Sequence, residues 1–254
     1  MPVRGRVVMD AAAAGGTGSG AGIGQAILYE DDWLIAVDKP AGLIVHGDGT
    51  GAPTLTDVAR AQLEARDGAE ATAGLQAVQR LDRDTTGVVL FSKVKDVQPA
   101  LDCMVADRSL EKTYLAIACG RIPWGERRLT GAIGRDRHDA RRMRVSPTGK
   151  PARTDVRVLA RRAGQGRVPA CSLVEVRLHT GRRHQIRVHL ASEGFPLLGD
   201  ELYGNGRAAT AFPLMLHAWR LAFEHPVTGK RVVIEAPVPE RFERLFRDLI
   251  GITG

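Results

Sequence analysis

Short stretches in which apolar and polar residues alternate recur along the chain, and this period of two residues predicts β-strands. Two other apolar runs, "WLIAV" and "GVVLFSKV", are continuous, as in strands that are buried on both faces. The final pair of strands flanks a Thr-Gly turn. The ranges that predict strands are 33–37, 87–94, 112–120, 152–161, 171–181 and two strands within 215–237.

Apolar residues spaced three and four positions apart occur in fewer segments, and these predict amphipathic helices. One helix is expected to begin after Thr54, because a threonine followed three residues later by an acid, Asp57, forms the capping box of a helix N-terminus. Further helices are expected over 96–108, 184–194 and 239–250. Strands outnumber helices and do not alternate regularly with them, so the pattern predicts an α+β fold with a mixed, mostly antiparallel central sheet and flanking helices.

The first part of the chain carries neither pattern. Residues 11–24 read "AAAAGGTGSGAGIG", a low-complexity tract of small residues that cannot form a packed core. The whole chain of 254 residues is 44% hydrophobic and is long enough to bury one full core. We therefore expect a disordered Gly/Ala-rich tail over residues 1–25 and one folded domain over residues 26–254.

The balance of charges favours an anionic partner. Lys and Arg total 36 against 29 Asp and Glu, which gives a formal net charge of +7 and a pI of about 9.8. Such an excess suits a nucleic acid or an acidic membrane surface. A GC-rich genome that encodes arginine in place of lysine is the alternative explanation.

The cysteines and the apolar runs indicate where the protein resides. The three cysteines, Cys103, Cys119 and Cys171, show no C-x-x-C spacing, so they indicate neither a zinc knuckle nor a disulfide framework. The longest apolar runs are far shorter than the roughly 18 residues of a membrane span, and no signal peptide is evident. We therefore expect no membrane association and a reducing cytoplasmic location.

Signatures of cofactor-dependent enzymes are missing from the sequence. The G-x-G cluster within residues 15–24 follows no predicted strand and lacks the Lys-Ser/Thr ending of a phosphate-binding loop. His184 and His189 are five residues apart, which is the wrong spacing for two metal ligands on one helical face. We expect no metal and no nucleotide cofactor.

Two clusters of charge lie beside apolar elements. In "QRLDRDTTG", residues 79–87, Asp82 lies between two arginines directly before a buried strand. In "TGRRHQIRVHLASEGFPLLGDELYG", residues 180–204, Arg187 falls in the first turns of an otherwise apolar helix, either as a surface charge or as the partner of a buried acid. An aspartate in a short loop is more often a turn or capping residue than a catalytic one, so residue chemistry alone leaves both readings open.

These two clusters resemble motifs of the RluA family of pseudouridine synthases. Residues 79–87 match the family pattern H-R-L-D-x-x-T-S-G with two departures. Gln79 replaces the usual His and Thr86 replaces the usual Ser, whereas the aspartate, Asp82, is retained. The blocks "DKPAGLIVH", "KTYLAIACG" and "LHAWRLAFEHP" and the second cluster follow in the family's order, so the resemblance extends from about Ile27 to Phe242. Many relatives carry an N-terminal S4 RNA-binding domain, and here the glycine-rich tract occupies that place.

The resemblance implies an RNA-binding cleft and an enzyme that converts a uridine of RNA into pseudouridine without a cofactor. It makes residues 26–254 the catalytic domain, Asp82 the nucleophile and Arg187 the cation that keeps this carboxylate ionised. Tyr114 would stack on the uracil once the base is flipped out of the RNA, and Arg80 would fill the vacated space. The strand neighbours of Tyr114 on its own face are alanines, which leave space around the ring.

Given this resemblance, we expect the basic residues between Arg135 and Arg162 to bind RNA. This stretch carries ten Lys or Arg against three Asp and predicts a long insertion that ends in a strand. A solvated charged loop is the alternative for it, and a surface ion pair is expected for Arg83 and Asp84. The residues expected to contact phosphates are Arg141, Arg142, Arg144, Arg182 and Arg183.

The target RNA is the least defined expectation. The block "GDELYG" through "LMLHA" resembles the RluA type without an S4 domain, which implies a monomer that modifies a uridine in a compact stem-loop of tRNA, of 23S ribosomal RNA, or of both. Another arm of tRNA and a helix of large-subunit ribosomal RNA are alternatives. A non-catalytic RNA-binding module would not need Asp82, Tyr114 and Arg187 together, and a hydrolase with paired carboxylates would need Asp84 as its second acid.

Overall fold

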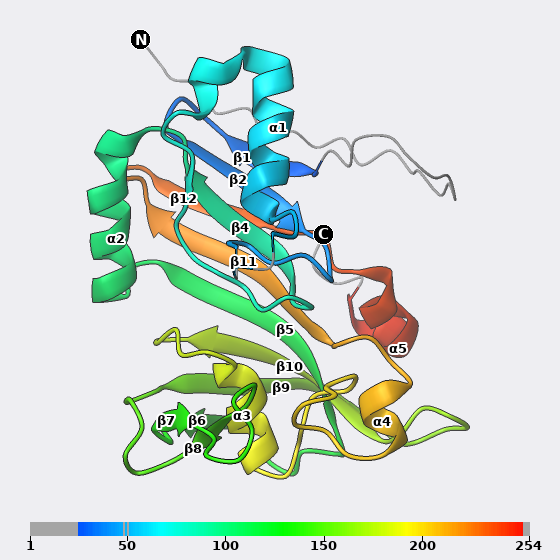
Figure 1. Ribbon diagram of the computed structural model, residues 1–254. Coiled ribbons are helices and arrows are strands. Elements are labelled where there is room, and N and C mark those ends of the chain that lie inside the picture. Colours follow the sequence, from blue (N-terminus) through cyan, green and yellow to red (C-terminus); the bar gives the residue numbers. More distant parts are fainter. Residues whose placement is uncertain (1–24, 48, 50, 251–254) are drawn as a thin grey trace.

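The computed structural model describes residues 25–47, 49 and 51–250, which form one large sheet with helices on both faces (Figure 1). The glycine-rich tract over residues 11–24, predicted to be disordered, lies outside the described residues. None of the described helices is long and apolar enough to cross a membrane.

The large sheet contains ten strands in the order β1-β2-β4-β11-β5-β10-β9-β6, with β12 beside β11 and β3 beside β4. β4 and β11 run parallel, whereas the other paired strands run antiparallel. The prediction of an α+β fold with a mixed, mostly antiparallel sheet is confirmed. The ten strands are β1 (Ile27–Glu30), β2 (Leu34–Lys39), β3 (Gln76–Ala77), β4 (Thr86–Ser92), β5 (Glu111–Cys119), β6 (Glu126–Leu129), β9 (Thr154–Arg162), β10 (Cys171–Leu178), β11 (Leu216–Glu224) and β12 (Arg231–Glu235).

All four helices that were predicted from apolar spacing are present. The last of them is interrupted at Phe246, whose φ of −138° and ψ of 42° are not helical. The α-helices are α1 (Leu55–Asp67), α2 (Gln98–Asp107), α3 (Gln185–Ser192), α4 (Arg207–Thr210) and α5 (Glu240–Ile250), and the 3-10 helices are η1 (Ala69–Thr72) and η2 (Lys95–Val97).

The N-terminus of α1 has the predicted capping box. The backbone N–H of Asp57 donates to the Thr54 hydroxyl at 3.2 Å, and the Asp57 carboxylate accepts the Thr54 backbone N–H at 2.9 Å. Two of the N–H groups that a helix start leaves without an intrahelical partner are thereby satisfied. The helix then buries Leu55, Ala59 and Leu63 against the sheet.

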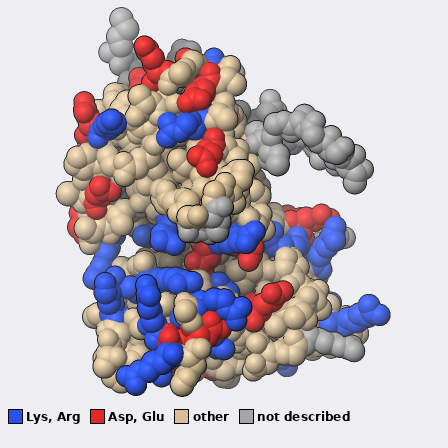
Figure 2. Space-filling view, viewed as in Figure 1, with Lys and Arg blue, Asp and Glu red and all other residues tan. Residues whose placement is uncertain are grey.

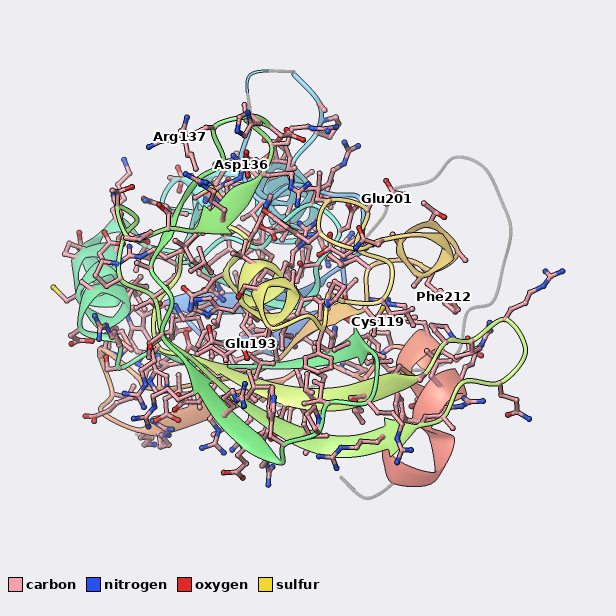
Figure 3. All side chains as sticks on the ribbon, turned by 90° about the horizontal axis from the view of Figure 1, so that it is seen from below. Cys119, Asp136, Arg137, Glu193, Glu201 and Phe212 are labelled. Atoms are coloured by element: carbon pink, nitrogen blue, oxygen red, sulfur yellow. The ribbon has the colours of Figure 1, made fainter. Side chains whose placement is uncertain are left out.

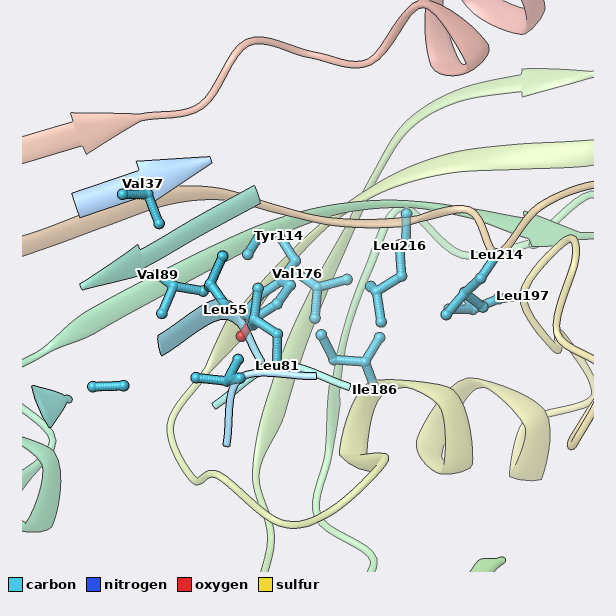
Figure 4. Close-up of a cluster of buried hydrophobic side chains, with 14 of the residues drawn as sticks. Val37, Leu55, Leu81, Val89, Tyr114, Val176, Ile186, Leu197, Leu214 and Leu216 are labelled. Carbon is cyan, nitrogen blue, oxygen red and sulfur yellow. The ribbon is translucent and has the colours of Figure 1, made fainter. Parts of the chain in front are cut away.

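Alternate residues of β5 face opposite sides of the sheet, as the period of two requires. Tyr114 packs on the face that α1 and α3 cover, whereas Leu115 belongs to the cluster on the opposite face, together with Phe242 of α5. In Figure 4 the side chains of Tyr114, Leu216 and Ile186 approach one another from β5, β11 and α3. The face covered by α1 and α3 is the one that carries the candidate site.

Several short elements were not predicted, because a hydrophobic period cannot be read from two to four residues. They are β1, β3, β6, α4 and a separate hairpin of β7 (Ile133–Arg135) and β8 (Met143–Val145). The hairpin lies in the basic stretch that was predicted to be an insertion, and β9 is the strand predicted at its end.

Candidate active site

The loop that carries Asp82 is held in place by the end of β2 and by the segment that follows it. The ammonium group of the fully buried Lys39 donates to the carbonyl oxygen of Arg83 at 2.7 Å. Arg83 in turn donates through Nε to the carbonyl oxygen of Gly42 at 3.1 Å and accepts the Gly42 N–H at 3.0 Å. Arg83 therefore joins two loops, and this contact replaces the surface ion pair that was predicted between Arg83 and Asp84.

Gly87, the last residue of the motif, allows β4 and β11 to approach closely. Its φ is +109°, and a Cβ atom at this position would lie 2.2 Å from the carbonyl oxygen of Ala218. Any other residue would have to move the backbone of β11. The glycine thus fixes where the loop of Asp82 enters the sheet.

Arg187 joins two carboxylates in the cleft. Its Nη1 lies 3.4 Å from Oδ2 of Asp82, and its Nε and Nη2 each donate to an oxygen of Asp200 at 2.8 Å. The side chain of Asp200 is fully buried, whereas that of Asp82 is 26% exposed. Arg187 is therefore close to Asp82, as the resemblance implies, but Asp82 is partly exposed, and the buried acid that Arg187 pairs with is Asp200.

Asp200 keeps the guanidinium group of Arg187 charged and in place. Burial opposes that charge, but the hydrogen bonds and charge of Asp200, together with the charge of Asp82, outweigh burial and raise the pKa of Arg187. Asp200 also accepts the backbone N–H groups of Leu202 and Tyr203, each at 3.1 Å. Sequence reasoning marked the block that contains Asp200 but gave this residue no role, although an acid directly after "LLG" was the available signal.

Tyr114 lies in the floor of the cleft with its hydroxyl protonated. β5 places its side chain on the α1 and α3 face, where it is 7% exposed. Burial, and then the negative charge of Asp82, raise the pKa of Tyr114 above its ordinary value. The phenol at neutral pH is therefore a neutral hydrogen-bond donor near the carboxylate.

Two hollows meet at Asp82 and Arg187, which line both of them. The first, of about 280 Å³, has an apolar wall that includes Leu178 and Leu216 beside Tyr114. The second, of about 780 Å³, extends from the loop after β2 to the segment between α3 and β11. Figure 2 shows this hollowed face, with Lys and Arg side chains on both sides of the hollow.

The arginines expected to bind RNA from the two sequence clusters lie around these hollows. Arg80 is exposed and lines both hollows. Arg183 also lines both, whereas Arg182 lines the first and donates through Nε to the carbonyl oxygen of Pro151 at 3.1 Å. The structure thus brings these three side chains to the rim of the cleft.

The arginines of the hairpin differ from one another in exposure and in their contacts. Arg141 lines the second hollow and is paired with Asp139 at 2.8 Å. Arg142 is exposed, with its guanidinium carbon 5.3 Å from the ring centre of Tyr203, and Arg144 is half-buried on β8. In Figure 3 Asp136 and Arg137 lie at the outer edge of the hairpin, away from the large sheet. The hairpin therefore presents a basic edge beside the cleft.

The paired-carboxylate hydrolase considered from the sequence finds little support in this geometry. Asp84 is exposed and lines the second hollow without lining the first. Within residues 25–47, 49 and 51–250, no group of three or more His, Cys, Asp or Glu side chains is arranged to hold a metal ion.

Thr86, a residue of the motif, forms a buried hydrogen-bonded group with Arg241 and His217. The hydroxyl of Thr86, which takes the place of the family's serine, is 2.7 Å from Nη2 of Arg241 and 2.8 Å from Nδ1 of His217. Because arginine only donates, the threonine hydrogen is free for His217. Burial, and then the charge of Arg241, lower the pKa of His217 to about 4. Burial raises the pKa of Asp38 to about 6, against the opposing charges of Arg241 and Lys39.

These two pKa shifts predict opposing contributions to acid stability. His217 favours folding when it is neutral, so its contribution is complete above pH 6.5 and is lost as the pH falls toward 4, at a cost of about 3 kcal/mol. Asp38 favours folding when it is protonated, so acidification from about pH 6 offsets that loss. We expect Asp38→Asn to remove the offset. Urea unfolding at about pH 7 and about pH 4 should then show a drop in unfolding free energy about 2 kcal/mol larger in the variant than in wild type, whereas equal drops would contradict the opposing shifts.

Comparison with known proteins gives consistent matches. The family model for RNA pseudouridylate synthase matches residues 33–192. An uncharacterized RNA pseudouridine synthase of Bacillus subtilis, YhcT, is 39% identical over 222 residues, which are 87% of this chain and 71% of that protein. The ribosomal large subunit pseudouridine synthase D of Neisseria meningitidis is 37% identical over 238 residues, and the match covers 84% of this chain but only 58% of that relative. The structure of human RNA pseudouridylate synthase domain containing 1 superposes with a TM-score of 0.71 at 27% identity and covers 88% of this chain and 87% of that one.

Proposed function

This chain belongs to the RNA pseudouridylate synthase family, and from that premise we propose that it isomerises a uridine of large-subunit ribosomal RNA, with Asp82 as the nucleophile. The observation that carries the proposal is the position of Asp82, whose carboxylate lies at the junction of two hollows beside a fixed guanidinium group. Residues 26–254 are the catalytic domain in this proposal.

The reaction needs no oxidant, metal or second substrate. The bond between N1 of the uracil and C1′ of the ribose breaks, the uracil turns, and a bond forms between C5 and C1′. The proton that leaves C5 is balanced by one that is gained at N1, so the product is an isomer of the substrate. An ionised carboxylate suffices as the nucleophile, and Arg187 stabilises that ionised form in a partly desolvated site.

The first hollow suits a single pyrimidine base that has left the RNA stack. Its apolar wall and the ring of Tyr114 offer a stacking surface, which is how proteins hold unstacked bases. The neutral phenol of Tyr114 can donate to a uracil oxygen. Arg80, exposed at the rim, is placed to enter the space that the flipped base leaves in the RNA.

The RNA backbone follows the basic rim in this proposal. Arg182, Arg183 and Arg141 line the hollows, and Arg142 and Arg144 extend the basic surface along the hairpin. Such side chains bind phosphates without reading sequence, so they orient the RNA and leave the choice of uridine to its shape and to the flipped base.

Ribosomal RNA is the favoured substrate because the relative from Neisseria meningitidis is named for the large ribosomal subunit. A stem-loop of tRNA, which the sequence motifs favour, is the second candidate. The reducing cytoplasm and the monomeric state stay predictions from the sequence.

The substrate is tested by mapping pseudouridine in total RNA from a strain that lacks the gene. We expect one uridine of large-subunit ribosomal RNA to lose its modification and to regain it when the wild-type gene is restored. Loss confined to a tRNA hairpin would overturn the ribosomal assignment in favour of the second candidate. An unchanged map for both RNAs would contradict the proposed function.

A further inference from the structure

His184, at the start of α3, faces a different oxygen of the Asp82 carboxylate from the one that Arg187 faces. Its Nε2 lies 3.9 Å from Oδ1 of Asp82, while Nη1 of Arg187 lies 3.4 Å from Oδ2, so each carboxylate oxygen faces a different nitrogen. The His184 side chain is 8% exposed and lines both hollows. We propose that His184 is a positioning residue that fixes the orientation of the Asp82 carboxylate and is itself oriented by Tyr203. This inference rests on the proposed role of Asp82 as nucleophile.

The hydrogen bonds of Tyr203 decide which nitrogen of His184 carries the hydrogen. The backbone N–H of Met143 donates to the Tyr203 hydroxyl at 2.8 Å, which leaves the hydroxyl hydrogen free for Nδ1 of His184, also at 2.8 Å. Nδ1 is then the acceptor, and Nε2 carries the hydrogen that faces Asp82. His184 in this form presents its Nε2 hydrogen toward the carboxylate, 3.9 Å away, and does not compete with it as a base.

Burial keeps His184 in this single-hydrogen form. Burial lowers the pKa of His184, the charge of Asp82 opposes that shift, and the charges of Arg187 and Arg183 add to it. A neutral donor holds the carboxylate without a second full positive charge beside it. The nucleophilicity of Asp82 is therefore preserved while its orientation is restricted.

The backbone of His184 is held in an unusual conformation. Its φ of +56° is in the left-handed region, which within the described residues only Arg108 shares among non-glycine residues. Residues other than glycine adopt this conformation uncommonly, although histidine does so more often than most, and the cost is tolerated where surrounding contacts fix the geometry. His184 immediately precedes α3, so this conformation directs its ring toward Tyr203 and Asp82.

Tyr203 also connects the pair to the neighbouring arginines. The guanidinium carbon of Arg187 lies 5.2 Å from its ring centre, and that of Arg142 lies 5.3 Å away. Its hydroxyl is bonded to Met143, on the same strand, β8, as Arg144. RNA that binds the hairpin would therefore lie next to Tyr203, the residue that orients His184.

The test compares variants in single-turnover reactions at saturating RNA, with ribosomal RNA from the deletion strain as substrate. Asn tolerates left-handed backbone but is too short to reach Asp82, so His184→Asn should lower the rate roughly a hundredfold. RNA affinity should stay within about threefold, because the loss lies in orientation and not in binding. The amide of a Gln side chain reaches about the position of the histidine Nε2. The rate of His184→Gln should therefore be about tenfold higher than that of His184→Asn.

Further variants separate positioning from structure. Tyr203→Phe removes the hydroxyl and keeps the ring, and the double variant His184→Asn/Tyr203→Phe should be no slower than His184→Asn alone, since the two residues act as one unit. His179 pairs with Asp155 at 2.9 Å and lines neither hollow, so His179→Asn is the matched control and should keep the wild-type rate.

A wild-type rate in His184→Asn, or equal rates in His184→Asn and His184→Gln, would overturn the inference while leaving the proposed function intact. A wild-type protein that forms no pseudouridine in this RNA would instead refute the proposed function.

Discussion

Asp82→Asn is expected to abolish pseudouridine formation while RNA affinity stays within about tenfold of wild type. The amide has the size of the carboxylate but cannot act as the nucleophile, so the single-turnover rate should fall by at least about 10³-fold. The fold should remain intact, because Asp82 is 26% exposed and Arg187 keeps its bidentate partner Asp200. Filter binding and single-turnover assays on the same RNA measure the two quantities separately.

Asp84→Asn is the matched control for this variant. Asp84 is an exposed carboxylate two residues away and does not line the first hollow. We expect near-wild-type turnover from it, which would also exclude the paired-carboxylate hydrolase considered from the sequence. Measurable turnover by Asp82→Asn would remove Asp82 from the nucleophile role.

Arg187→Ala should lose both activity and stability. The substitution leaves the fully buried carboxylate of Asp200 without its cation, and among the described residues the backbone N–H groups of Leu202 and Tyr203 remain as its hydrogen-bond donors. Breaking a buried ion pair from one side costs about 3 to 5 kcal/mol of unfolding free energy. Activity is lost as well, since Asp82 no longer has a cation beside it. Urea unfolding measures the first effect, and the pseudouridine assay measures the second.

A double substitution separates these two effects. Arg187→Met roughly preserves the volume of the arginine, and adding Asp200→Asn removes the charge that was left unpaired, so the double variant should be more stable than Arg187→Met alone. It should stay inactive, because Asp82 still lacks its cation. An Arg187→Ala protein with wild-type stability and activity would show that neither ion pair matters.

Local patterns predicted most of the fold because long elements carry a readable period. Thr54 and Asp57 formed the predicted capping box, and the alternation along β5 placed Tyr114 on the face opposite Leu115. Elements such as β7 and β8 have three residues each, which is too few for a period. Their pairing depends on contacts that no local pattern records.

The sequence predicted only those site residues to which a family motif assigns a role. Asp82 and Arg187 are 105 residues apart and meet in the structure as expected. Asp200 was missed because an aspartate in a loop has the same local chemistry whether it is exposed or buried. His184 was weighed only as a metal ligand, since its contact with Tyr203 depends on a left-handed backbone that the sequence does not reveal.

The proposed chemistry is tested most directly by incubating the purified protein with unmodified 23S ribosomal RNA and tRNA, with a metal chelator and without added nucleotide. Pseudouridine is then mapped at single-nucleotide resolution. We predict that wild-type protein converts one defined uridine and that Asp82→Asn converts none. Absence of pseudouridine from every RNA after treatment with wild-type protein, or equal conversion by Asp82→Asn, would contradict the proposal that this chain is a pseudouridine synthase acting through Asp82.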